Sequence, residues 1–125
     1  MMTDMTMDNF LAVLSSSEPV PGGGGACGYV AAVGMSLGNM VLALTTGKKK
    51  YAEYQEEIEE LIVKATDLTK RLAECMDKDA ESFKPLAAAY GLPKDTEEQI
   101  KEREAIMAKA LVTASEAPLS MMELI

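Results

Sequence analysis

The sequence predicts an all-α fold, a bundle of about four helices, on the basis of two observations. Apolar residues make up 48% of the 125 residues, yet aromatic residues make up only 5% and methionine occurs 10 times. This composition favours adaptable aliphatic packing between helices over a β-sandwich. Apolar residues also recur at spacings of three and four in several segments, which is the period of an amphipathic helix. The length fits a single domain, residues 1–125.

The charge and cysteine content limit the function classes. Lys and Arg number 12 against 20 Asp and Glu, so the net charge is −8, which repels phosphate backbones and anionic membrane surfaces. We therefore expect no nucleic-acid partner. The amino terminus, MMTDMTMDN, is acidic where a secretion signal is basic, which predicts a cytoplasmic protein with Cys27 and Cys75 reduced. The chain has no His and no zinc-site spacing of its cysteines, so no metal is expected.

The first helix is predicted over residues 6–16. Thr6 offers an N-terminal cap, and four apolar residues follow it at helical spacing: Met7, Phe10, Leu11 and Leu14. The stretch SSSEPVPGGGG then breaks the pattern.

The second segment, residues 26–46, contains no charged residue and ends at Gly47, with Lys48 to Lys50 beyond it. A left-handed glycine and cations are typical of a helix C-terminus. The segment is about long enough to cross a bilayer, but Gly34 and Gly38 also suit close helix packing inside a protein. We expect a core helix that is buried on every side and covered in part by a second subunit. Membrane insertion stays open as an alternative.

Two further helices complete the predicted bundle. An apolar stripe indicates one long amphipathic helix from about Lys50 towards Pro85 or Gly91; its members are Tyr51, Tyr54, Ile58, Leu61, Ala65, Leu68, Leu72 and Cys75. The last helix opens with Asp95 or Thr96 as its cap and continues to Pro118, which ends or bends it.

A carboxylate interrupts the stripe of the long helix. Continuing the three and four spacing after Cys75 leads to Asp79, where an apolar residue is expected. An unpaired buried carboxylate costs several kcal/mol or takes up a proton, so Asp79 needs a partner or a task. Asp77 and Glu81 lie on other faces and need no explanation. Arg103 interrupts the stripe of the last helix in a similar way, and the two can face each other, as a plain buried salt bridge or as a catalytic or ligand-binding pair.

The glycine run Gly22 to Gly25 matches neither a P-loop nor a dinucleotide-binding motif, because no strand and no Gly-Lys-Ser or GxGxxG pattern accompanies it. A flexible linker is one interpretation. The other is that glycine lets a ligand or a second backbone approach the free N–H groups of the following helix. The lysines after Gly47 are either a solvated charge run or a local positive site for an anionic tail.

Four stretches in this order resemble the cyclodeaminase/cyclohydrolase family, which includes formiminotetrahydrofolate cyclodeaminases and methenyltetrahydrofolate cyclohydrolases. They are FLAVLSSSEPVPGGGGACG, NMVLALTTGKKKY, CMDKDAESFKPLAAAYGLPKDTEE and EREAIMAKALVTASEAPL. The resemblance implies an all-helical homodimer that binds a reduced folate, with or without a polyglutamate tail, and no metal. It implies cyclisation of 5-formiminotetrahydrofolate to 5,10-methenyltetrahydrofolate with release of ammonia. The alternatives are methenyltetrahydrofolate cyclohydrolase activity or a non-catalytic helical dimer.

The resemblance also assigns site residues. The family's proposed catalytic acidic residue corresponds to Asp79. The substrate-binding positions correspond to Pro21, Gly22, Gly23, Gly24, Gly25, Lys48, Lys49 and Arg103. Gly25 stands where the family turn usually has a Ser, which removes a hydroxyl from the turn. Family domains continue with further helices after Pro118-Leu119, so the resemblance implies that the chain covers about the first two-thirds of the domain.

Overall fold

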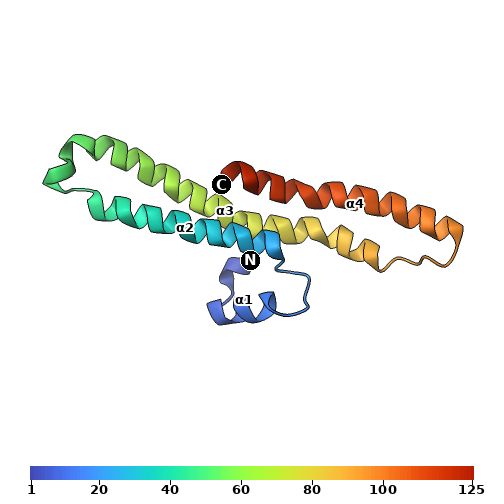
Figure 1. The fold of residues 1–125 in the computed structure, drawn as a ribbon. Helices are drawn as coiled ribbons and strands as arrows, with labels where there is room; N and C mark the ends of the chain where they lie inside the picture. Colours follow the sequence, from blue (N-terminus) through green and yellow to red (C-terminus); the bar gives the residue numbers. More distant parts are fainter.

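All 125 residues are described by a computed structural model, which consists of helices joined by short loops and contains no strand (Figure 1). The predicted all-α class and the four-helix count are confirmed. The helices are α1 (Met7–Leu14), α2 (Gly23–Thr45), α3 (Gln55–Tyr90) and α4 (Glu97–Leu124), with short 3-10 helices η1 (Met2–Asp4) and η2 (Lys49–Tyr54).

Helix α3 is the central helix of the molecule, and the other two long helices lie along it. Its 36 residues span about 54 Å at 1.5 Å per residue. Figure 1 shows α2 running antiparallel along the first part of α3 and α4 running antiparallel along the second part. Helix α1 lies beside the middle of the bundle, near the start of α2. The three long helices therefore overlap only in the middle of α3.

The helix ends follow the capping signals of the sequence. The Thr6 hydroxyl accepts a hydrogen bond from the Asn9 amide at 3.1 Å. Thr96 and Gln99 form a reciprocal capping box at the start of α4, with backbone-to-side-chain distances of 3.2 Å in both directions. Gly47 has a φ of 75°, a left-handed conformation that glycine adopts without steric cost and that ends α2.

The predicted start of the second helix is wrong, and one of the two alternatives for Pro118, that it ends the last helix, is excluded. Helix α2 begins at Gly23, so the glycine run forms its first turn instead of a loop before it. Helix α4 continues through Pro118 to Leu124. Proline removes only one backbone hydrogen bond, and beyond it Met121 is 3% exposed, so its packing stabilises the last turns.

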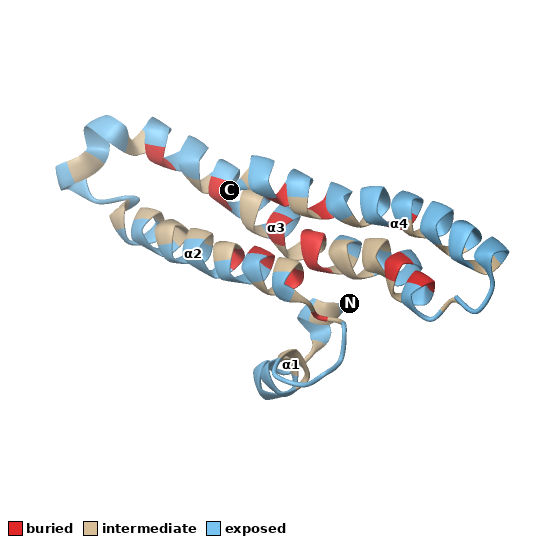
Figure 2. Ribbon diagram, turned by 45° about the vertical axis from the view of Figure 1, so that its right-hand side comes forward, coloured by how far each residue is buried: buried red, intermediate tan, exposed pale blue.

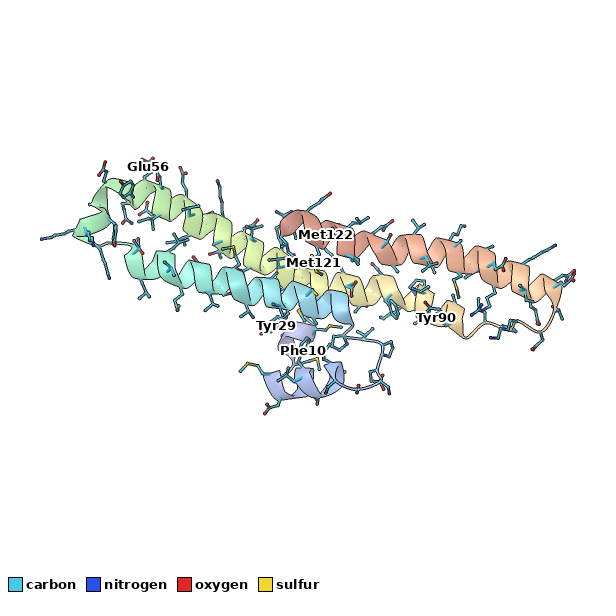
Figure 3. All side chains as sticks on the ribbon, viewed as in Figure 1. Phe10, Tyr29, Glu56, Tyr90, Met121 and Met122 are labelled. Carbon is cyan, nitrogen blue, oxygen red and sulfur yellow. The ribbon has the colours of Figure 1, made fainter.

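The core lies where the three long helices meet. Its buried cluster comprises Ala32 of α2, Leu72 and Cys75 of α3, and Met121 of α4. Figure 3 shows Met121 at this crossing. A Cβ on Gly28 would lie 2.8 Å from Met121 Cε and 3.4 Å from the Leu72 carbonyl oxygen. The absence of a side chain at Gly28 is therefore what lets α2 approach the other two helices this closely.

The single chain covers only one side of α2, and burial of the other side by a second subunit stays a prediction. Only Gly25, Gly28 and Ala32 of this helix are buried, and Figure 2 shows burial confined to the side that faces α3. The opposite side exposes a row of large apolar side chains: Val30, Val33, Leu37, Met40, Val41 and Leu44. Within the chain, α3 is the helix that runs along α2, and it cannot cover the opposite side of α2. By length and composition alone, α2 is also apolar enough to cross a membrane.

Candidate functional site

Asp79 lies on α3 directly against the first turn of α2. A Cβ placed on Gly24 would lie 3.0 Å from both Asp79 carboxylate oxygens, and one on Gly25 would lie 3.9 Å from Oδ2. The Asp79 residue is half-buried. The periodicity of the sequence thus identified an inward carboxylate correctly, and the glycine turn is the element that it faces.

The surroundings of Asp79 favour a proton on its carboxylate. Burial raises the pKa of Asp79 above its usual value of 3.8, while a hydrogen bond from the Gly25 backbone opposes the rise in part. No side chain caps the start of α2, so the N–H groups of its first turn are free to bind a carboxylate or a ligand. Burial of the carboxylate and the positive end of the α2 dipole therefore act in opposite directions on its charge.

Pro21 and Gly22 position the glycine turn. Pro21 is buried and follows Val20 through a cis peptide bond. Gly22 is the N-terminal cap residue of α2, and its carbonyl accepts from the Ala26 amide at 3.0 Å. A methyl group on Gly23 would have no atom within 4 Å. Of the helical glycines in this run, Gly24 is therefore the position at which a side chain would collide with the carboxylate.

Asp79 and Arg103, which the sequence allowed to face each other, form no ion pair within the chain. The ion pairs of the structure are Met1 with Asp4, Asp67 with Arg71, and Glu81 with Lys84. Asp79 lies about three turns before the end of α3, whereas Arg103 lies about two turns into α4. Arg103 instead lines a cavity of about 250 Å³ beside Leu92 and Pro93, with its Nε buried and without a hydrogen-bond partner.

Lys48 and Lys49 lie at the other end of α2 from the glycine turn. The 23 residues of α2 span about 34 Å, and both lysines are exposed. Within one chain, the sequence-predicted site residues therefore divide into three places. Asp79 and residues 21–25 converge, while the two lysines and Arg103 lie apart from them.

The sequence interpretation missed two features near Asp79. Asp77 is not a simple solvated residue, because its Oδ1 accepts a hydrogen bond from the Met2 amide at 2.9 Å and its Oδ2 is buried without a partner. Met76 is only 1% exposed, although the predicted apolar stripe includes Cys75 and not Met76. Its position four residues after the buried Leu72 was the signal available for it.

No metal-binding group emerges from the fold. The structure brings no three Cys, Asp or Glu side chains into an arrangement that could hold a metal ion. The carboxylate of Asp79 and the backbone N–H groups of α2 are the polar groups that this region offers to a ligand. Such a set can move a proton and can bind electronegative atoms.

Comparison with known proteins gives consistent results. Residues 6–125 match the family described as formiminotransferase-cyclodeaminase. A methenyltetrahydrofolate cyclohydrolase from Methylorubrum extorquens is 42% identical over 115 residues, which are 92% of this chain and 55% of that protein. A formimidoyltransferase-cyclodeaminase from Dictyostelium discoideum is 32% identical over 98% of this chain and 22% of its own length. The chain thus spans about half the length, or less, of these relatives.

The fold also matches a solved structure. The formiminotetrahydrofolate cyclodeaminase from Thermotoga maritima superposes with a TM-score of 0.81 at 24% sequence identity, covering 99% of this chain and 58% of the other. The similarity at this identity concerns the fold. It indicates that the arrangement of three long helices and the small α1 also occurs within a longer chain.

Proposed function

Because the chain belongs to the formiminotransferase-cyclodeaminase family, we propose that it acts on a reduced folate in one-carbon metabolism, with Asp79 moving protons at the carbon that bridges N5 and N10. The observation that carries this proposal is the half-buried carboxylate against the glycine turn. It is the convergent part of the predicted site and has no cationic partner.

The first reaction is the cyclisation of 5-formiminotetrahydrofolate. The N10 lone pair attacks the formimino carbon and forms the N10–C bond, and N10 loses its proton. The former imino nitrogen gains protons, and its bond to carbon breaks to release ammonia. The overall reaction consumes one proton and leaves the cationic 5,10-methenyl product. Holding N10 beside the carbon and supplying these protons are the two contributions that a protein can make.

Asp79 suits this sequence of proton transfers. A raised pKa brings a carboxyl group closer to the pH at which it can both accept and donate a proton. Asp79 takes the N10 proton and returns a proton to the departing nitrogen. Once ionised, it also stabilises the cationic product by its negative charge.

The second candidate reaction is hydrolysis of 5,10-methenyltetrahydrofolate, and a specific observation favours it. The relative named methenyltetrahydrofolate cyclohydrolase has 42% identity, compared with 32% for the formimidoyltransferase-cyclodeaminase of Dictyostelium. Water adds to the bridging carbon, a base removes its proton, and the N5–C bond breaks to give a 10-formyl product and release one proton overall. Asp79 serves as that base.

A pair of assays distinguishes these reactions. With 5-formiminotetrahydrofolate, a cyclodeaminase releases ammonia and builds up the absorbance of the methenyl product. With 5,10-methenyltetrahydrofolate, a cyclohydrolase removes that absorbance faster than buffer alone. Acceleration of neither reaction would contradict the proposal and favour a non-catalytic helical protein.

The assembly that we propose is a homodimer covering the exposed side of α2. Six large apolar side chains lie on that side, and a soluble protein rarely leaves a patch of this kind open. A second copy would also supply lysines equivalent to Lys48 and Lys49 for the carboxylates of a folate's glutamate tail. Sedimentation equilibrium tests this part, since a monomer at assay concentrations would contradict it. The net charge of −8 supports a protein that does not bind nucleic acid or anionic membrane surfaces, and the acidic amino terminus supports a cytoplasmic location.

A further inference from the structure

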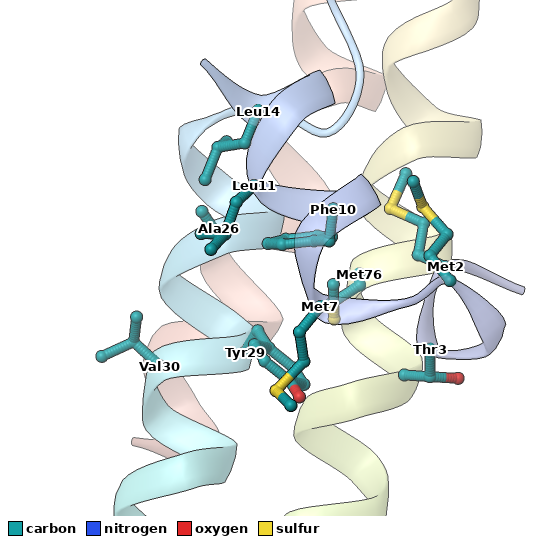
Figure 4. A pocket seen from close by; sticks show the side chains of 11 residues that line it. Met2, Thr3, Met7, Phe10, Leu11, Leu14, Ala26, Tyr29, Val30 and Met76 are labelled. Atoms are coloured by element: carbon teal, nitrogen blue, oxygen red, sulfur yellow. The ribbon is translucent and has the colours of Figure 1, made fainter.

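A cavity that has no role in the reactions proposed so far adjoins the Asp79 site. It has a volume of about 230 Å³ and lies between residues 1–14, here called the N-terminal segment, and helices α2 and α3 (Figure 4). Four methionines and two aromatic rings dominate its wall: Met2, Met5, Met7, Met76, Phe10 and Tyr29. No charged side chain lines it, and the polar side-chain groups among its lining residues are the hydroxyls of Thr3 and Tyr29.

The N-terminal segment is fixed at two points around this cavity. The Met2 amide donates a hydrogen bond to Asp77 Oδ1 at 2.9 Å. The rings of Phe10 and Tyr29 lie side by side between α1 and α2, with centroids 5.6 Å apart and a tilt of 47° (Figure 3). The cavity is the space between these two contacts, where the N-terminal segment does not pack directly on α2 and α3.

The cavity is lined by residues close to Asp79 and Gly25 along their helices, although Asp79 and Gly25 do not line it themselves. Met76 lines the cavity and lies one helical turn before Asp79, on the same side of α3. Ala26 lines the cavity from α2 and follows Gly25. A Cβ on Gly25 would lie 3.9 Å from Asp79 Oδ2 and 4.0 Å from Met76 Cα. A molecule that fills the cavity therefore lies about one turn of α3 from the residue that carries the carboxylate.

We propose that this cavity binds the neutral benzoyl ring that N10 of a reduced folate carries, which makes the N-terminal segment part of the substrate site. This inference rests on the proposed function. The ring is bonded directly to N10, so a ring held in the cavity brings N10 towards Asp79. Such positioning is a large part of what a protein contributes to ring closure.

The chemistry of the wall selects this ring over the other end of the molecule. A dry apolar cavity of about 150 Å³ is large enough for benzene, so 230 Å³ accommodates a substituted benzene ring. Methionine sulfur makes favourable contacts with aromatic edges and adapts to their shape. The pterin end carries several N–H groups and a carbonyl, more than two hydroxyls can pair, and the groups left without partners would cost several kcal/mol.

Methyl NMR on methionine-labelled protein tests the proposal without depending on turnover. The probes are p-aminobenzoylglutamate and 5-formyltetrahydrofolate, a stable reduced folate. Bound ring currents are expected to shift the methyl signals of Met2, Met5, Met7 and Met76. The methyls of Met35, Met40, Met107 and Met122 lie outside the cavity and serve as the internal control.

A cavity-filling variant gives the matched affinity test. Ala26→Leu puts extra side-chain volume into the cavity and is expected to weaken binding of p-aminobenzoylglutamate about tenfold, which is a loss of about 1.4 kcal/mol. Ala108→Leu makes the same change at an exposed position of α4 and is expected to leave affinity unchanged. Circular dichroism confirms folding of both variants, and the NMR experiment on the unaltered chain decides the matter if Ala26→Leu fails to fold.

Each outcome separates the ring site from the reaction. Shifts confined to the four cavity methyls support the ring site, even if neither folate reaction is accelerated and the proposed function fails. Turnover while those methyls stay unchanged overturns the ring site and leaves the proposed function intact. No turnover and no shifted methyl overturns both. Cavity shifts that follow protein concentration without any ligand would make a second copy the occupant and overturn the ring site.

Discussion

The carboxylate of Asp79 lies so close to Gly24 that a methyl group on this glycine would be 3.0 Å from both carboxylate oxygens. Helix α2 therefore begins with residues that have no side chains at the place where α3 presents an acid. The contact joins the two features that the sequence marks as unusual, the glycine run and the interrupted stripe. A substitution at Gly24 can therefore displace the carboxylate without changing Asp79 itself.

Gly24→Ala is expected to displace the Asp79 side chain and to reduce turnover of a folate substrate by tenfold or more, which corresponds to at least about 1.4 kcal/mol. Gly23→Ala is the matched control, because a Cβ there meets nothing within 4 Å. The control is expected to leave the Asp79 side chain in place and to gain up to about 1 kcal/mol of stability. Equal activity of the two variants would contradict the importance of this contact.

Asp79→Asn is expected to change the pH dependence of stability. Burial raises the pKa of Asp79 above 3.8, so the folded protein holds this proton more tightly than the unfolded chain. The free energy of unfolding of the native protein therefore falls as pH rises from about 3.8 through the folded-state pKa. The Asn variant lacks this fall. Urea unfolding measures the free energy of unfolding of the variant relative to that of the native protein. This difference is expected to show no gain below that pH range and its full gain near pH 7.

Gly25→Ser is expected to be accepted by the fold and to lower the pKa of Asp79. A Cβ at Gly25 meets Asp79 Oδ2 at 3.9 Å and Met76 Cα at 4.0 Å, which are ordinary contact distances. The added hydroxyl can donate to the carboxylate, and a hydrogen bond to the charged form favours it. Carboxyl NMR titration measures the shift. A higher pKa in the variant would show that the hydroxyl points elsewhere.

Gly28→Ala is expected to destabilise the crossing of the three long helices by about 1 kcal/mol, because the new methyl must push Met121 aside. The nearest Met121 atoms would lie at 2.8 Å and 3.1 Å. Gly34→Ala, on the same helix with open space around it, is expected to be stabilising. Thermal unfolding of both variants provides the comparison, and an unchanged melting temperature for Gly28→Ala would argue against this close packing.

The sequence was informative where a local rule decides the structure. Thr6, Gly47 and Thr96 act through neighbouring backbone groups, so their positions at helix ends were predictable. The inward direction of Asp79 followed from the stripe, because helical spacing fixes the face on which a residue lies.

Relations between helices were not predictable in the same way. Spacing fixes a face but not the depth along a neighbouring helix, so the sequence left open whether Asp79 and Arg103 meet, and in the structure they lie at different depths. The anchoring role of Asp77 depends on the path of the N-terminal segment, which no periodicity describes. The exposure of α2 reflects how much surface one long neighbour can cover, and the sequence analysis expected a second subunit to cover the rest.

The most direct test of the central claim is the rate of folate conversion by Asp79→Asn, measured with 5-formiminotetrahydrofolate and with 5,10-methenyltetrahydrofolate. Asp67→Asn is the control, since Asp67 is an exposed acid on the same helix, paired with Arg71. The account predicts that Asp79→Asn lowers the rate at least about a hundredfold in a folded protein and that Asp67→Asn leaves it unchanged. An Asp79→Asn protein that converts either substrate at the unaltered rate would contradict a proton-transfer role for this carboxylate.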